Sequence, residues 1–289
     1  MSVFVSSGAF PSNDLDEILA LCARHGIDRV ELSSGLGHAG DVDRSLEAAS
    51  QDMELLIHNY FPPPDIPFTL NLASADDEIR RRSIALCTNA IDLCERVGAS
   101  YYSVHSGFAH DFKPAELGHS DAQAAALSTT GTDRQAAYGR FRECVRIVSD
   151  HAAAKGIDLL LENNVAAPRL IEMAGFNPLL MVEADEILDC LDDIGRPNVH
   201  LLLDVAHLMV SSNALGFDPR KFIDKVGPRV AALHVSDNDG YRDQNLMTTT
   251  ESWYLPALRS FGDRDIVIES YNLTPSQILS QIDLIESHI

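Results

Sequence analysis

The sequence predicts an α/β fold, namely a single-domain (β/α)8 TIM barrel over residues 1–289. Short apolar runs alternate with helix-length segments along the whole chain, and crossover connections of that length join parallel strands. Two runs read LLL, at 159–161 and 201–203, and continuous apolar runs are typical of strands buried on both faces. The first run is followed by SSGAFPSN and not by the GxGxxG turn of a doubly wound open sheet, which favours the closed barrel.

Eight runs have the length and the β-branched or leucine-rich composition of strands. In chain order they are residues 2–6, 28–32, 54–59, 100–105, 157–162, 199–204, 230–235 and 265–269. Four segments have helical periodicity, at residues 14–26, 76–98, 138–156 and 276–289. In the first of these segments Leu15, Ile18 and Cys22 recur at helical spacing, and Gly26 follows as a C-cap.

Three connections are long, and each follows the carboxyl end of a predicted strand. They are residues 106–131, 163–183 and 236–251. TIM barrels build their active sites from the loops at this end of the strands. We therefore expect the functional site to lie among these connections.

The composition restricts the partners and the location of the protein. The formal net charge is -21, and no cluster of Lys and Arg is available to neutralise phosphates, so nucleic acid is not expected as a partner. No apolar run is long enough to cross a bilayer, and the start, MSVFVSSGAF, lacks the features of a secretion signal. The five cysteines are scattered, four of them within helical patterns, as expected for reduced core residues. These features predict a cytoplasmic protein without a membrane partner.

Acidic or imidazole side chains end seven of the eight predicted strands. They are Glu31, His58 (followed by Asn59), His105, Glu162, Asp204, His234 and Glu269. Closing the barrel brings all of these strand ends to one mouth. Several carboxylates gathered there repel one another unless a cation neutralises them, and a mixed oxygen and nitrogen set suits Mn²⁺, Co²⁺, Mg²⁺ or Zn²⁺. The sequence therefore predicts a divalent-metal site at the mouth.

Three further residues have two interpretations each. His207 follows Asp204 at i+3, so it either binds metal or substrate or lies in the first helical turn, bonded to a carboxylate. Asn164 either binds substrate hydroxyls, with its neighbour Asn163, or belongs to a turn that favours Asn. Arg242 either binds a phosphate or carbonyl oxygen of a substrate or is an exposed loop residue.

Six motifs occur in one order along essentially the whole chain: ELLIHNYFPPP, YSVHSGF, LLLENN, LLLDVAH, ALHVSDNDG and VIES. In this order the sequence resembles the xylose-isomerase-like TIM barrels, a superfamily of sugar phosphate isomerases and epimerases and endonuclease IV. Each motif alone is weak, whereas the set is fairly specific for the superfamily and much less specific for one substrate.

The resemblance to the ketose-epimerase branch implies a complete catalytic site. There one metal ion is held by residues that match Glu162, Asp204, His234 and Glu269. The same resemblance makes Glu162 and Glu269 the acid/base pair, which moves a proton next to a carbonyl through a metal-stabilised enediolate, and makes His207 a substrate contact. It implies no cofactor other than the divalent metal ion.

The endonuclease IV branch uses three zinc ions and additional histidines. His58 and His105 match two of these, but Asn245 stands where the Asp-x-His motif after the seventh strand requires His. This departure puts a third metal in doubt. It leaves His58 and His105 open between a second metal and hydrogen bonds to sugar hydroxyls, and we favour the hydroxyls.

The leading hypothesis is a metal-dependent isomerase or epimerase that acts on a sugar or sugar derivative. Its predicted substrate-binding residues are His58, His105, Asn164, His207 and Arg242. One alternative is a metal-dependent phosphoesterase or lyase of endonuclease IV type that acts on a small substrate, and another is a non-catalytic sugar-binding barrel. A homo-oligomer is expected by analogy with the superfamily.

Overall fold

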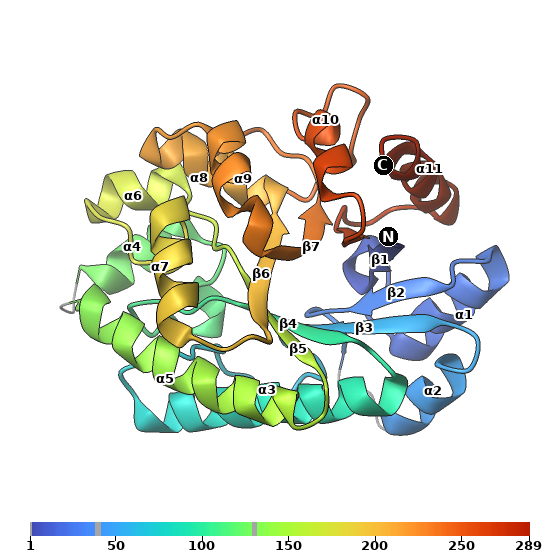
Figure 1. Cartoon of the computed structure of the whole chain (residues 1–289), viewed down its shortest axis with the longest axis horizontal. Helices are drawn as coiled ribbons and strands as arrows, with labels where there is room; N and C mark the ends of the chain where they lie inside the picture. Colours follow the sequence, from blue (N-terminus) through green and yellow to red (C-terminus); the bar gives the residue numbers. More distant parts are fainter. Residues whose placement is uncertain (1, 38–41, 129–131) are drawn as a thin grey trace.

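Eight parallel strands close into a barrel in chain order (Figure 1). The structure is a computed structural model that describes residues 2–37, 42–128 and 132–289. The strands are β1 (Val3–Ser6), β2 (Arg29–Leu32), β3 (Glu54–His58), β4 (Tyr101–His105), β5 (Asp158–Glu162), β6 (Val199–Asp204), β7 (Val230–Val235) and β8 (Asp265–Ile268). The barrel prediction is confirmed, and each strand end lies within one residue of the predicted position.

Pairing between the first and last strands closes the barrel. Val3 pairs with Ile266 and Val5 with Ile268, in the parallel sense, so that no strand edge is left open. The apolar runs Leu159 to Leu161 and Leu201 to Leu203 are fully buried, because the helices cover the outside of the sheet and side chains fill the inside.

Helices follow the strands and cover the barrel (Figure 1). The α-helices are α1 (Leu15–His25), α2 (Val42–Ala49), α3 (Asp77–Val97), α4 (Ser120–Leu127), α5 (Arg134–Ala153), α6 (Pro168–Ala174), α7 (Ala184–Ile194), α8 (Val205–Leu215), α9 (Pro219–Val226), α10 (Leu255–Leu258) and α11 (Pro275–Glu286). Short 3-10 turns are η1 (Ser7–Ala9), η2 (Pro114–Glu116), η3 (Gly227–Arg229) and η4 (Arg259–Phe261).

The helix ends follow the chemistry of their sequences. The side chains of Asp14 and Asp76 cap the first turns of α1 and α3, and the left-handed Gly26 and Gly98 end these helices. The third predicted helix, α5, begins at Arg134 and therefore earlier than residue 138. The side chain of Asp133 caps its first turn by accepting from the amide of Ala136. All five cysteines are free and buried, and the fifth, Cys190, also lies in a helix, α7.

Among the described residues, no helix has both the length and the hydrophobicity that a bilayer crossing requires. The cytoplasmic location stays a prediction.

Two of the long connections at the carboxyl ends of the strands are joined to each other. The connection after β4 contains η2 and α4, the connection after β5 contains α6, and residues 129–131 of the former lie outside the described part. Phe108 and Leu179 form an antiparallel bridge between the two connections. The amide of Ala109 donates to the carbonyl of Pro178 at 2.8 Å, so the two connections form one hydrogen-bonded unit.

Asn71 anchors this unit to the segment before α3. Its fully buried side chain accepts from the amides of Ala73 and Phe108 and donates to three oxygens of residues 108–111. Gly107 permits the close approach, since a Cβ there would lie 2.8 Å from the Asn71 side-chain oxygen.

Replacing Asn71 by alanine is expected to lower the free energy of unfolding by about 3 kcal/mol, because it leaves the buried amide of Ala73 and the part-buried amide of Phe108 without their acceptor. Urea unfolding of both proteins measures this. As a control, Asn89→Ala, on the exposed face of α3, should change stability by less than about 0.5 kcal/mol. Equal stabilities of the Asn71 and Asn89 variants would contradict the anchoring role.

Candidate active site

Four adjacent strands bring the predicted metal ligands together. Glu162, Asp204, His234 and Glu269 end or directly follow β5, β6, β7 and β8, and all four are buried. Each offers one donor atom, and the four donor atoms lie within 4.8 Å of one another. Protein donors lie about 2.0–2.6 Å from a divalent ion, so this spacing is close to that of ligands around a single ion.

Several polar atoms in this group have no partner. Both carboxylate oxygens of Glu162 and Nδ1 of His234 are buried without a hydrogen-bond partner among the described residues. His234 Nδ1 lies 3.2 Å from Glu269 Oε2 and 3.8 Å from Glu162 Oε1. Buried polar atoms normally have partners, and a divalent cation would serve all of these atoms at once. The residues therefore fit a divalent metal ion.

The electrostatics of the protein alone show how strongly the carboxylates interact. Burial raises the pKa of Asp204 to about 7. In Glu162 the effect of burial is outweighed by His105, His58 and His234, which hold its pKa well below the usual range. Conversely, Glu31 and Glu269 overcome burial and hold the pKa of His234 well above its usual value. His105 and His234, whose pKa values are raised, thus carry positive charge that balances the carboxylates.

His58 and His105 approach Glu162 from β3 and β4. Their Nε2 atoms lie 3.4 Å and 3.1 Å, respectively, from Glu162 Oε2, and the three residues form a second group with metal-ligand spacing. The His58 ring is buried behind Glu162, where its Nδ1 contacts Ser103 Oγ at 2.9 Å, and burial lowers the pKa of His58 to about 3. The His105 side chain is 37% exposed, so His105 is the better placed of the two to contact a substrate.

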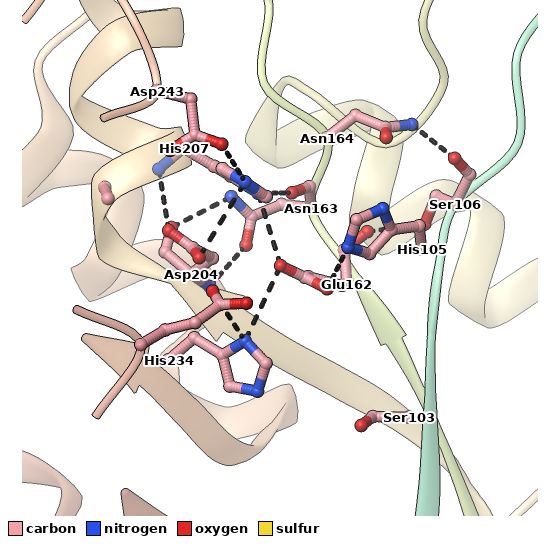
Figure 2. Close-up of polar contacts among 12 residues, drawn as sticks. Ser103, His105, Ser106, Glu162, Asn163, Asn164, Asp204, His207, His234 and Asp243 are labelled. Atoms are coloured by element: carbon pink, nitrogen blue, oxygen red, sulfur yellow. Dashed lines mark hydrogen bonds and ion pairs between the residues drawn. The ribbon is translucent and has the colours of Figure 1, made fainter. Parts of the chain in front are cut away.

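His207 lies in the first turn of α8, in the helical arrangement considered for it (Figure 2). Asp204 caps this helix by accepting from the His207 amide at 2.7 Å. The His207 ring contacts the Asn163 carbonyl through Nδ1 at 2.9 Å and Asp243 Oδ2 through Nε2 at 3.3 Å. The ring also lines the cavity described below, so a substrate contact by His207 stays a prediction.

Asn164 and Arg242 are largely engaged within the protein. The Asn164 side-chain nitrogen donates to the carbonyls of Ser106, Gly107 and Leu180, which leaves only its side-chain oxygen for a substrate hydroxyl. Arg242 is an exposed loop residue whose guanidinium contacts Asp239 Oδ2 at 2.6 Å and 3.1 Å. Substrate binding by these two residues stays a prediction.

Glu31 has a position that the strand-end pattern indicated without giving it a role. It is fully buried, and its Oε2 lies 3.2 Å from His234 Nε2. An ionised carboxylate only accepts, so Nε2 donates to Glu31 and Nδ1 is the ring nitrogen that faces Glu269 and Glu162. Nδ1 could serve as a metal ligand once it has lost its proton. Carboxylates behind metal-binding histidines fix the ring orientation in this way.

The variant Glu31→Gln is expected to bind Mn²⁺ and Co²⁺ about 10- to 100-fold more weakly, because His234 loses its charged orienting partner. Titration calorimetry measures the affinity, and the visible spectrum of the Co²⁺ protein reports the ligand geometry. Glu54→Gln, at the exposed start of β3, is the matched control and should leave both readouts unchanged. Unchanged affinity in Glu31→Gln would mean that the carboxylate does not position His234.

Tyr271 is a second site residue that the sequence did not reveal. Its hydroxyl donates to Glu269 Oε1 at 3.3 Å, and the Glu269 charge raises the pKa of Tyr271, which keeps it protonated as a donor. Gly8 makes room for the ring, because a Cβ at Gly8 would lie 2.7 Å from it. No strand pattern identifies a residue in the loop after β8.

A cavity of about 920 Å³ opens beside the metal group. His105, His207 and Asp243 line one part of it, and both histidines contact Glu162. Figure 2 shows the His105, His207 and His234 rings around Glu162. The remaining lining comes mainly from the segments after β3, β4 and β5 and is rich in apolar side chains. A small molecule in this cavity would therefore reach the edge of the predicted metal site.

Comparison with known proteins gives consistent results. A family model described as "Xylose isomerase-like TIM barrel" matches residues 7–253. Fructoselysine 3-epimerase of Shigella flexneri is 21% identical over 252 residues, which cover 85% of this chain and 78% of the relative. A probable endonuclease 4 of Thermoplasma acidophilum is 23% identical over 175 residues, 59% of this chain and 50% of the relative. A solved D-tagatose 3-epimerase-like protein superposes with a TM-score of 0.71 at 18% identity, covering 100% of this chain and 97% of the other.

Proposed function

The chain belongs to the xylose isomerase-like TIM barrel family, and from this we propose that it is a divalent-metal-dependent epimerase or isomerase of a sugar or sugar derivative. The observation that carries the proposal is the buried group of Glu162, Asp204, His234 and Glu269, which has metal-ligand spacing and contains two glutamates. The names of the similar fructoselysine and D-tagatose 3-epimerases support the same class of reaction.

In this proposal Glu162 and Glu269 transfer the proton. The pKa of each carboxyl is held below its usual value, by His105 and other histidines for Glu162 and by His234 for Glu269, which opposes burial and keeps both groups ready to accept a proton. Glu162 ends β5 and Glu269 directly follows β8. In the proposed reaction one of them takes the proton next to the carbonyl and the other returns it on the opposite face. When bound, a divalent ion supplies Lewis-acid stabilisation of the negative charge that develops on substrate oxygens.

The neighbouring residues have distinct tasks in this reaction. Tyr271 holds Glu269 through its hydroxyl, and Glu31 holds the His234 ring. His105 and His207 lie where the cavity meets Glu162, so they contact the hydroxyls of a bound sugar. The surrounding apolar lining excludes water from the proton transfer.

Deuterium exchange tests the proposal directly. The Mn²⁺- or Co²⁺-loaded protein is incubated in D₂O with D-fructose, D-tagatose, D-psicose and L-ribulose, and NMR follows each sugar. We expect deuterium at a carbon next to the carbonyl of at least one sugar, together with its epimer or isomer. A metal-loaded protein that exchanges no proton in any of these sugars would speak against the assignment.

A phosphoesterase or lyase of endonuclease IV type is the second candidate function. It is favoured by the group of His58, His105 and Glu162, which has the spacing for another metal ion. The formal charge of -21 and the presence of Asn245 in place of a third-site histidine weaken it for a nucleic acid substrate. Metal content separates the two candidates: one ion per chain supports the epimerase, and two or three support the phosphoesterase.

A further inference from the structure

Building on the proposed function, we propose that the natural substrate is an unphosphorylated sugar derivative that carries an apolar substituent. The substituent binds a surface that we call the apolar wall, which is part of the cavity beside the metal group. The apolar wall consists of Phe68, Leu70, Phe108, Leu117, Leu170 and Leu179.

The apolar wall lies in the cavity that opens beside the metal group. His105 and His207 line the cavity together with the wall residues, and they contact Glu162 at 3.1 Å and 3.3 Å. In the proposal the reacting carbon lies near Glu162 and the substituent extends past these histidines into the cavity. The volume of about 920 Å³ is near the upper end of the range for drug-sized ligands, so there is room beyond a single sugar.

Part of the apolar wall is held in place by contacts outside the main core, whereas Leu70 belongs to the main core and Phe68 packs against it. Phe108 packs against two small hydrophobic clusters that are separate from the main core, one around Leu170 and one around Leu179. The bridge between Phe108 and Leu179 holds the two clusters together, and Asn71 fixes the backbone of Phe108. Within the wall, Leu70, Leu170 and Leu179 are buried, Phe68 and Phe108 are half-buried, and Leu117 is 36% exposed.

The charges around the cavity argue against a phosphate group on the substrate. Among the described residues that line it, Arg242 is the one permanently charged cation, and Asp239 already pairs with its guanidinium. The lining histidines, whose pKa values are raised, already face carboxylates: His105 contacts Glu162, and His207 contacts Glu162 and Asp243. A phosphate dianion would need at least one unpaired Arg or Lys here, whereas an aryl or alkyl group needs only apolar area.

Binding measurements on the metal-loaded protein test the proposal without requiring turnover. The probes are D-fructose, its 1-O-benzyl and 6-O-benzyl ethers, and D-fructose 6-phosphate, each titrated calorimetrically. We expect at least one benzyl ether to bind about 10- to 100-fold more tightly than D-fructose, the gain that burial of a ring-sized apolar group provides. The phosphate ester should bind no more tightly than D-fructose.

Two variants test whether the tighter binding of the benzyl ether comes from the apolar wall. Leu117→Asp places a charge in the apolar wall and should remove most of the advantage of the benzyl ether while leaving Mn²⁺ affinity unchanged. Met173→Asp is the matched control, because Met173 is 44% exposed on the adjacent α6 but does not line the cavity, and it should retain the full advantage.

Three results would overturn the inference: tighter binding of the phosphate ester than of D-fructose, no gain from either benzyl ether, or a gain that survives in Leu117→Asp. Deuterium exchange separates this failure from failure of the proposed function. If the protein epimerises D-fructose but binds the benzyl ethers no more tightly, the proposed activity stands and only the apolar substituent is rejected. If the protein binds the benzyl ether through Leu117 but exchanges no proton, the binding site stands and the proposed activity is rejected.

Discussion

Replacing both Glu162 and Glu269 by glutamine is expected to lower the rate of deuterium exchange by at least about 10⁴-fold, and each single replacement by about 10²- to 10⁴-fold. Glutamine keeps the size and hydrogen-bonding capacity of the side chain but cannot accept the substrate proton. Initial rates of exchange in D₂O, measured by NMR at saturating metal and sugar, give the effect. The single losses should not multiply in the double variant, because both residues act in one proton relay.

Two comparisons make this prediction specific. Glu251→Gln, in the exposed connection after β7, should exchange at the parent rate. Circular dichroism and thermal unfolding of the double variant, compared with the parent at equal metal occupancy, exclude loss of the fold. If the double variant retained the full biological function of the parent protein, the chain would instead be a sugar-binding barrel without catalysis.

Removing the metal is expected to abolish exchange and to destabilise the protein. A ligand present at 1,000 times its dissociation constant adds about 4 kcal/mol to the stability of the folded state. Chelation by EDTA should therefore lower the melting temperature by roughly 10 °C for a chain of this size. The physical reason is that Glu162 and His234 have buried atoms without partners until a cation is bound. Differential scanning calorimetry with Mn²⁺, Co²⁺, Mg²⁺ and Zn²⁺ added back singly measures the recovery.

Asp204→Asn provides the control for metal removal. Asparagine can still cap α8 by accepting from the His207 amide, so the fold should persist, but it is a weaker ligand than the carboxylate. Chelation should then shift the melting temperature of this variant much less than that of the parent. Equal shifts in the two proteins would show that the stabilising ion binds elsewhere.

The strands and the location of the site could be predicted from the sequence because both depend on local patterns. A fully buried parallel strand is a continuous apolar run, as at residues 159–161, and its end is marked by the first polar side chain, Glu162. Once eight such runs are assigned to a barrel, geometry alone places Asp204 and His234 beside Glu162. No knowledge of distant contacts is needed for this step.

The remaining features depend on contacts between distant segments, which a local pattern does not contain. The pairing of Phe108 with Leu179 joins residues 71 positions apart, and both residues line the cavity. His58 and His105 both end predicted strands, yet only the structure places His58 behind Glu162 and His105 at the cavity. The partner of Glu31, His234, was hidden for the same reason.

The bridge between the connections after β4 and β5 also affects how the substrate range of this barrel can change. Each connection supplies backbone donors and acceptors to the other, as in the bond from the Leu180 amide to the Gly107 carbonyl. Grafting one of these loops alone from a relative would leave those backbone donors and acceptors without hydrogen-bond partners. Laboratory evolution or chimera design should therefore transplant segments 106–128 and 163–183 as one cassette, and recombination crossovers between them should yield poorly folded progeny.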